Sequence, residues 1–317
     1  MVSKSEDVAR AAGVSRATVS QILNGRGQRF AEATRARVLQ IAAEMEYRPS
    51  IAGRALAMGV SDIVVAVLPY TDLSPNLQAV LEHATDVLAA HNLTLVLQLT
   101  TPGGVSLAQM VASLRPRAVM ALWPFSDGDR EVLKQAGVAG ISPSEFDNGF
   151  DLRIGRSQAE YLMAQGYQRL AYVHLDDERF AAFSEPRERG VVEVCAEGGL
   201  PEPVVLRSPL APGDVLAVID ALPDHTGIAC YNDDLAIALL HAASIRGRTV
   251  PSGLGIIGMD DSPLAATTHP RLTTVSVDVT TAATAFIRVL LAELGITGDG
   301  LGSGRDLVPE IVAGESA

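Results

Sequence analysis

The chain has 317 residues, of which 48% are hydrophobic and 20% are charged. This composition excludes a disordered chain, because there is enough apolar surface to offset the entropy lost on folding. A length above roughly 250–300 residues favours more than one folding unit. No apolar run reaches the roughly 20 residues of a membrane helix. Residues 1–7 include Glu6 and Asp7, where a signal peptide would have its apolar stretch. We therefore expect a cytoplasmic protein without a membrane partner.

Charge is distributed unevenly along the chain, whose net charge is −12. Residues 1–59 contain nine Lys/Arg and five Asp/Glu, which gives +4, so residues 60–317 carry −16. A basic head on an acidic body indicates that one end of the chain meets a polyanion, such as nucleic acid.

The basic head is predicted to be a bundle of short helices. A Ser-x-x-Glu capping box starts the first helix at Ser3, Gly13 suits a left-handed turn, and Ser15 can cap the second helix. The pattern predicts helices over residues 3–12, 15–23, 32–46 and 51–58.

The first two helices have the spacing of a helix-turn-helix. Ala9 is small enough for a close crossing, Gly13 forms the turn, and Val19 anchors the second helix on the first. The outer face of that second helix is then polar, and such a helix fits the major groove of B-form DNA. A generic three-helix bundle has similar geometry, so spacing alone leaves that alternative open.

From residue 61 onward, strand-like runs alternate with helical stretches in two series. This alternation predicts parallel sheets with helices on both faces. The two series predict two similar lobes. The expected strands are 63–68, 93–97, 118–122, 170–173, 204–206, 227–230 and 254–257, and the expected helices are 77–91, 158–165, 190–197, 215–221 and 235–244.

The residue pattern resembles the lactose-repressor/galactose-repressor (LacI/GalR) family over nearly the whole chain. In the head the likeness is carried by DVARAAGVSRATVS at 7–20, and by residues 23–25, 32–38 and 47–49. In the body it is clearest in YNDDLA at 231–236, IGMDD at 257–261 and PRLTTV at 270–275.

The resemblance implies a small all-α helix-turn-helix head and an α/β two-lobed body, similar to periplasmic binding proteins, with two doubly wound parallel sheets. It implies that the lobes are joined by crossings near residues 146, 276 and 305. The expected domains are a DNA-binding domain at 1–47, a hinge helix or linker at 48–59, and an effector-binding and dimerisation domain at 60–317, with lobe one over 60–146 and 277–305 and lobe two over 147–276 and 306–317.

By the same resemblance, the second helix carries the DNA contacts. Arginine can pair in bidentate fashion with guanine, and glutamine with adenine, although a phosphate contact is the alternative for Arg16. A departure from the family pattern is Ala31, where a serine usually caps the third helix; the loss costs about 1 kcal/mol of local stability. The base-reading positions are Arg16, Ala17 and Gln21, and the phosphate-contacting positions are Thr18, Ser20 and Asn24.

Residues 51–56 resemble the hinge helix of the family. A helix of about eight residues is marginal in water, and Gly53 weakens it by about 1 kcal/mol relative to alanine. The resemblance implies that this helix forms on DNA and that Leu56 wedges between base pairs in the minor groove. The alternative is a plain linker, with Leu56 packed on the body.

The resemblance also implies effector contacts at Arg187, Asn232 and Asp260. The last two each follow a predicted strand, and ligands of open α/β sheets bind at the carboxyl ends of strands. A guanidinium, an amide and a carboxylate can together recognise a polyol. A helix N-cap and a turn are the structural alternatives for Asn232 and Asp260. Tyr70 and Trp123 can line the same cleft, with core packing as the alternative.

Nothing in the sequence supports catalysis. There is no P-loop, no G-x-S-x-G elbow and no H-E-x-x-H. Histidines such as His174 are scattered singly, which indicates surface or hydrogen-bonded structural positions. Cys195 and Cys230 belong to no C-x-x-C pair, which predicts reduced, buried thiols. We expect no enzyme activity, no metal and no cofactor.

The sequence thus predicts a DNA-binding transcriptional regulator, and more specifically a repressor. We expect it to bind a near-palindromic operator in double-stranded DNA as a homodimer, gated by a small polar effector, a sugar or a related compound, in the cleft between the lobes. The alternative is a cytoplasmic solute-binding sensor with weak or vestigial DNA binding.

Overall fold

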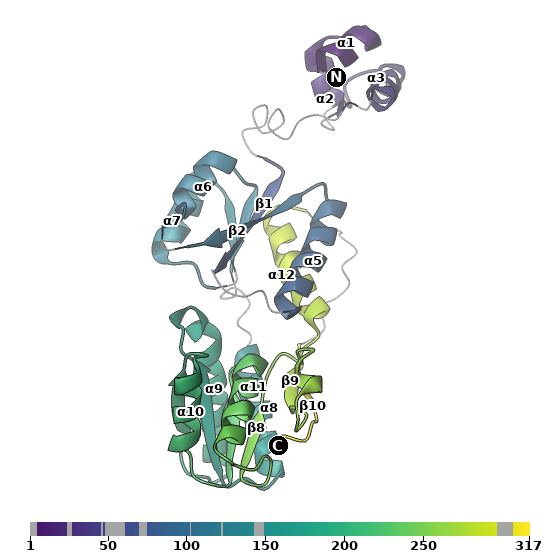
Figure 1. Cartoon of the computed structure of the whole chain (residues 1–317). Helices are drawn as coiled ribbons and strands as arrows, with labels where there is room; N and C mark the ends of the chain where they lie inside the picture. The colour runs from purple at the N-terminus through teal and green to yellow at the C-terminus, as the bar shows by residue number, and fades with distance from the viewer. Residues whose placement is uncertain are drawn as a thin grey trace.

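A computed structural model describes residues 5–23, 27–45, 47, 61–69, 75–101, 103–121, 123–142, 149–296 and 307–317. The predictions for Asn24, Gly53, Leu56 and Tyr70, for the hinge helix, and for the crossings near residues 146 and 305 fall outside these residues. Figure 1 shows a helical head followed by two α/β lobes, which confirms the predicted fold class. None of the described helices combines the length and the apolar character needed to traverse a bilayer.

The head consists of three helices, α1 (Ser5–Ala12), α2 (Arg16–Leu23) and α3 (Glu32–Glu44). The predicted cap of α2 is confirmed, because Ser15 Oγ accepts a hydrogen bond from Thr18 N at 3.1 Å. Ala31, the N-cap residue of α3, makes no side-chain capping hydrogen bond, because alanine has no side-chain acceptor. The buried core of the head is formed by Val8, Ala9, Ala12, Val19, Ile22, Val38 and Ala42.

The first lobe is built on a four-stranded parallel sheet in the order β2-β1-β3-β4. Successive residues of β1 point to opposite faces. Val64 and Ala66 pack with α5 and α12, and Val65 and Val67 pack with α6 and α7. The elements are β1 (Ile63–Pro69), β2 (Thr94–Thr100), β3 (Ala118–Ala121), β4 (Ala139–Ile141), α5 (Pro75–Ala90), α6 (Leu107–Leu114), α7 (Asp127–Ala136) and α12 (Val279–Glu293).

The second lobe repeats this plan with a parallel sheet in the order β6-β5-β7-β8. Ala171 and Val173 of β5 pack with α10 and α11 on one face, and Leu170 and Tyr172 pack with α8 and α9 on the other. The elements are β5 (Arg169–Leu175), β6 (Val204–Ser208), β7 (Thr226–Cys230), β8 (Leu254–Ile257), α8 (Phe150–Ala164), α9 (Ala181–Glu197), α10 (Pro212–Ala221) and α11 (Asp233–Ile245).

One connection between the lobes lies within the described residues. Strand β9 (Thr274–Ser276) pairs antiparallel with β10 (Glu310–Val312) beside the second sheet. The chain then passes directly into α12, which packs with α5 on the first sheet. Residues 277–278 therefore connect the two lobes (Figure 1).

The predicted starts of α8 and α9 were wrong. The sequence pattern placed them at residues 158 and 190, whereas the helices begin at Phe150 and Ala181. Helix α9 continues through Pro186, a residue that removes a helical hydrogen bond. Tertiary packing overrides that local cost, because α8 and α9 lie backbone against backbone: a Cβ added at Gly155 would lie 1.8 Å from Arg187 O.

Candidate functional site

Helix α2 is anchored by one face and presents polar side chains on the other. Val19 and Ile22 are buried in the core of the head. Arg16 and Ala17 are exposed, so two of the three positions predicted to read bases are open to solvent. The partly exposed residues of the same helix include Thr18, Ser20 and Gln21.

Two arginine side chains at the surface of the head pair with polar side chains. Arg16 Nη1 lies 3.6 Å from Glu6 Oε1, and Arg29 Nη2 donates a hydrogen bond to Gln21 Oε1. Both pairs are solvent-exposed and contribute little to stability, so their groups can turn to a polyanion at small cost. The family motif did not single out Arg29; the signal that could have found it is the basic run at residues 26–29.

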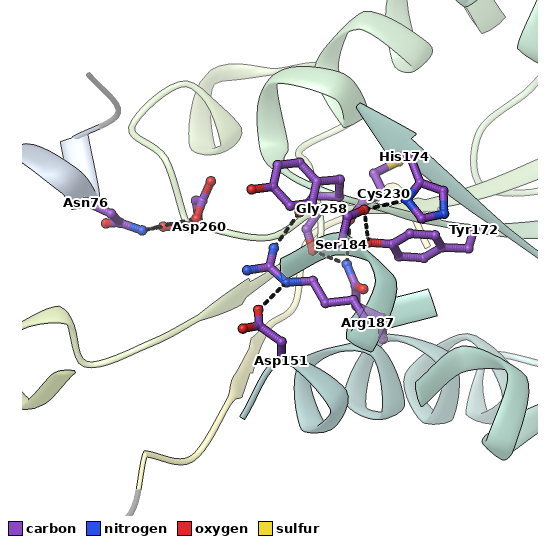
Figure 2. A network of polar contacts seen from close by, with 11 residues as sticks. Asn76, Asp151, Tyr172, His174, Ser184, Arg187, Cys230, Gly258 and Asp260 are labelled. Atoms are coloured by element: carbon purple, nitrogen blue, oxygen red, sulfur yellow. Dashed lines mark hydrogen bonds and ion pairs between the residues drawn. The ribbon is translucent and has the colours of Figure 1, made fainter. Parts of the chain in front are cut away.

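In the second lobe, polar groups gather at the carboxyl ends of β7 and β8 (Figure 2). Arg187 reaches this place from α9; its Nε donates to Asp151 Oδ1 at 2.7 Å, and its Nη1 donates to Tyr231 O at 2.8 Å. Its guanidinium also lies 4.9 Å from the centroid of the Tyr231 ring. These contacts fix the orientation of a buried cation, and among the described residues no hydrogen bond engages its Nη2. Asp151 was missed by the sequence analysis.

Asp260 follows β8 in an unusual backbone conformation. Its φ is 119° and that of Asp261 is 49°, a region that costs a residue other than glycine about 1–3 kcal/mol. Hydrogen bonds hold the loop in place: Asp260 N donates to Val275 O at 2.9 Å, and Ser262 N donates to Asp233 Oδ2 at 2.7 Å. Backbone strain held by its surroundings is a mark of functional sites.

The Asp260 carboxyl group titrates near neutrality. Burial raises the pKa of Asp260 to about 7, although Arg187 acts to lower it, and Asp233 raises it further. A carboxyl group with such a pKa exchanges between donor and acceptor roles close to neutral pH. It is therefore suited to hydrogen-bond the hydroxyl groups of a ligand.

Asn232 is a helix N-cap, which was the structural alternative for this residue. Its Oδ1 accepts a hydrogen bond from Leu235 N at 3.1 Å and caps α11. Within the described part of the chain, its Nδ2 makes no hydrogen bond, so the amide can cap the helix and still donate to a ligand. Trp123 packs, partly buried, against the hydrophobic cluster between the first sheet and α6 and α7.

A buried chain of hydrogen bonds lies behind Arg187, between β5 and α9 (Figure 2). His174 Nε2 lies 2.7 Å from Glu188 Oε2 and Nδ1 lies 2.6 Å from Ser184 Oγ, while Tyr172 OH lies 3.1 Å from the same Oγ. Burial lowers the pKa of His174, which favours a neutral ring that donates to Glu188 and accepts from Ser184. His174 is thus a hydrogen-bonded structural residue, as predicted.

This arrangement has the residue types of a hydrolase triad but not its accessibility. Ser184 is 2% exposed, so no substrate reaches its hydroxyl group. In the described part of the chain, no cluster of His, Cys, Asp and Glu side chains is arranged to hold a metal ion. Cys195 and Cys230 are buried free thiols, which confirms the prediction for both.

Comparisons with known proteins match the head and much of the body to two known kinds of domain. Residues 6–50 match the family model "Bacterial regulatory proteins, lacI family", and residues 159–317 match the periplasmic binding protein-like domain. The structure of a lac repressor dimer bound to operator and the anti-inducer ONPF superposes with a TM-score of 0.74 at 18% identity, covering 100% of this chain and 99% of that one.

Curated relatives cover the chain nearly from end to end. The HTH-type transcriptional regulator MalR of Streptomyces coelicolor is 29% identical over 94% of this chain and 92% of its own length. An uncharacterised HTH-type transcriptional regulator of Streptomyces limosus is 30% identical over 91% of this chain and 87% of its own length. Both relatives are named as regulators, which confirms the interpretation as a regulator and not an enzyme. The chain belongs to the lacI family of bacterial regulatory proteins.

Proposed function

We propose that the protein is a ligand-responsive repressor of transcription that binds a near-palindromic operator as a homodimer in the cytoplasm. The observation that carries this proposal is the presence, in one chain, of an anchored helix with exposed polar side chains and a two-lobed body with a cluster of polar groups at the carboxyl ends of β7 and β8. The proposed domains are the head at 1–47, the hinge at 48–59 and the body at 60–317, divided into lobes as predicted from the sequence.

The DNA contacts that we propose lie on α2 and in the hinge. A helix in the major groove reads bases through its exposed side chains, while hydroxyl groups and amides bind phosphates. In the hinge we propose that Gly53 keeps the helix unstable without DNA and that Leu56 enters the minor groove. The proposed base-reading residues are Arg16, Ala17 and Gln21, and the proposed phosphate contacts are Thr18, Ser20 and Asn24.

Substitution of Arg16 by alanine tests the readout of bases. We expect Arg16→Ala to weaken binding of the full-length chain to its operator by about 1–3 kcal/mol and to relax the preference at one base pair. The operator is first selected from a random duplex pool by the wild-type chain, and binding is then measured by fluorescence anisotropy across a salt series.

The matched control is Arg37→Ala, which removes another exposed arginine, from α3. It should leave the preference for bases unchanged. A loss of affinity for Arg16→Ala that is equal on all sequences would make Arg16 a phosphate contact. If the wild-type chain selects no duplex and shows no dependence of binding on salt, the solute-sensor alternative replaces the proposed function.

The cleft is suited to an uncharged, hydroxyl-rich effector, and we propose that its contacts are Arg187, Asn232 and Asp260, with Tyr70 and Trp123 as further candidates. The Arg187 cation is already paired with Asp151, so it has no unneutralised charge to offer a phosphate. Asp260 adds a second carboxyl group near Arg187, and Asp233 adds a third near Asp260. A phosphorylated or acidic ligand would bring further negative charge into this site, whereas sugar hydroxyl groups match its amide, guanidinium and carboxyl groups.

A thermal-shift screen of the full-length chain tests the chemical class of the effector. The panel pairs neutral sugars with their phosphates, for example glucose with glucose 6-phosphate, and adds polyols and nucleosides. A ligand at about 100 times its Kd adds about 2.7 kcal/mol to the free energy of unfolding. We expect a neutral member to raise the melting temperature; a shift caused by the phosphates alone would overturn the proposed class.

An edge strand in the first lobe supports the proposed homodimer. Strand β2 is an edge strand of the first sheet among the described residues, and its Leu97 and Leu99 are each 47% exposed. Two large exposed apolar residues on an edge strand are a site for association, and a dimer reads both halves of a palindromic operator. Sedimentation equilibrium of the full-length chain checks the stoichiometry, and a monomer at micromolar concentration would contradict it.

A further inference from the structure

A hydrogen bond joins the two lobes at Asp260, one of the proposed effector contacts. Asn76, in the first turn of α5, belongs to the first lobe, and Asp260 follows β8 in the second lobe. Asn76 Nδ2 donates to the main-chain oxygen of Asp260 at 2.7 Å and lies 3.5 Å from its Oδ1. Figure 2 shows the Asn76 amide directed at this loop from the opposite side to Arg187.

This hydrogen bond closes a ring of contacts around the connection between the lobes. The Asp260 main chain is bonded to β9 through Val275 O, and β9 leads through residues 277–278 into α12. Helix α12 packs against α5, where His83 Nε2 and Thr284 Oγ1 lie 2.9 Å apart. Asn76 then returns from α5 to Asp260 and completes the ring.

A ring of this kind has a mechanical consequence. An extended connection permits one lobe to rotate relative to the other, because only a few backbone torsion angles need to change. A hydrogen bond between the lobes close to such a connection removes part of that freedom and favours one angle between the lobes. The acceptor is a main-chain oxygen, so the position of the whole 260–262 loop is held and not only one side chain.

We propose that Asn76 is a positioning residue that sets the angle between the lobes in the effector-free protein by holding the Asp260 loop. This inference rests on the proposed function, in which the angle between the lobes controls the head. An effector that hydrogen-bonds the Asp260 carboxyl group acts on the same residue whose main chain Asn76 holds. Binding in the cleft and the angle between the lobes are thereby coupled through one loop.

The distance between the lobes, measured without any effector, tests the proposal. Spin labels are attached to the full-length chain at Val105→Cys, between β2 and α6 in the first lobe, and at Leu210→Cys, between β6 and α10 in the second lobe. These side chains are 56% and 48% exposed. Cys195 and Cys230 are buried and stay unlabelled. Dilution with unlabelled chain suppresses distances between protomers, and pulsed electron paramagnetic resonance then reports the distribution.

We expect Asn76→Ala to broaden or shift the distance distribution and the matched control Gln78→Ala to leave it unchanged. Gln78 is also an amide on α5, but its Nε2 is bonded to Glu82 on the exposed face. An unaltered distribution for Asn76→Ala, with a melting temperature equal to that of the wild type, overturns the proposal.

A titration of Asn76→Asp separates positioning from a merely structural role. At neutral pH the introduced carboxylate cannot donate to the Asp260 oxygen and should open the lobes further than Asn76→Ala. At low pH the protonated carboxyl group donates again, so the distribution should return toward that of the wild type. A parallel titration of the wild-type chain subtracts the effect of Asp260 itself; a distribution that does not respond to pH beyond that control contradicts the proposal.

Binding of DNA completes the test. On the duplex selected by the wild-type chain, we expect Asn76→Ala to change the apparent Kd by about threefold or more, because it alters the population of the binding-competent angle. Gln78→Ala should stay within about twofold of the wild type. Equal affinities for Asn76→Ala and the wild type overturn the coupling. Failure of the wild-type chain to select any duplex refutes the proposed function instead, and the distance measurement stands apart from it.

Discussion

Gly155→Ala is expected to destabilise the second lobe by about 3 kcal/mol, the upper part of the range for overpacking a core. A Cβ at Gly155 would lie 1.8 Å from Arg187 O, and one at the facing Gly190 would lie 2.3 Å from Leu152 O. Both obstacles are main-chain atoms within helices, so no side chain can rotate away to relieve the clash. The two helices must separate, and this separation loses apolar contacts along their whole interface.

We expect Gly155→Ala also to displace Arg187, a proposed effector contact, and so to weaken effector binding. The oxygen that the new methyl group displaces belongs to Arg187, whose side chain is bonded to Asp151 and to Tyr231 O. A shift of α9 therefore moves the guanidinium relative to the carboxyl ends of β7 and β8. Equilibrium unfolding in urea measures the first effect, and the effector titration measures the second.

Gly213→Ala is the matched control. A Cβ at Gly213, in the first turn of α10, meets nothing within 4 Å. Alanine favours a helix over glycine by about 1 kcal/mol, so this variant should be as stable as the wild type or more stable. If Gly155→Ala and Gly213→Ala have the same free energy of unfolding, the close approach of α8 and α9 does not govern the stability of this lobe.

Asp260→Asn is expected to abolish a dependence of stability on pH. Burial raises the pKa of Asp260 from 3.8 to about 7. Between these two values the folded protein retains a proton that the unfolded chain has released, so the free energy of unfolding falls as pH rises from about 4 to about 7 and is then level. At about 1.4 kcal/mol per pKa unit, the full shift is bounded by about 4 kcal/mol, and solvent at the partly open carboxyl group reduces it.

Urea unfolding of both proteins at pH 5, 6, 7 and 8 measures this effect. The variant should gain stability relative to the wild type as pH rises to about 7, because asparagine resembles the protonated carboxyl group at every pH. Contributions from other groups, such as His174, cancel in the difference between the two proteins. Parallel stability curves would show that the Asp260 carboxyl group ionises as readily in the folded protein as in the unfolded chain.

The effector response of the same variant tests the cleft. At pH 8, where the Asp260 carboxyl group is largely ionised, loss of a charge-assisted hydrogen bond costs about 1.5–3 kcal/mol, which raises the effector concentration required by about tenfold or more. Affinity for DNA without effector should stay within a few-fold, because the main-chain oxygen that accepts from Asn76 is kept. An unchanged effector titration would reduce Asp260 to a turn residue.

The sequence by itself determined the features that depend on near neighbours. The α2 cap at Ser15, the turn at Gly13 and the uncapped start of α3 all follow from interactions within a few residues. The strands β1, β2 and β3 of the first sheet and all four strands of the second sheet were predicted for the same reason, since a buried parallel strand is a short apolar run that its own composition reveals. The short strand β4 (Ala139–Ile141) was not predicted. Motif letters then related the chain to its family.

Only the tertiary structure decided the features that join distant segments. Helices α8 and α9 begin earlier than their periodicity predicts, because Gly155 and Gly190 let two backbones touch. Asp151 orients Arg187 from another helix, and Asn76 meets Asp260 across 184 positions of chain. Side-chain periodicity records which face of an element is buried, but it carries no information about which distant element covers that face. The partners of Arg187 and Asp260 therefore became visible only in the tertiary structure, within the second lobe for Asp151 and between the lobes for Asn76.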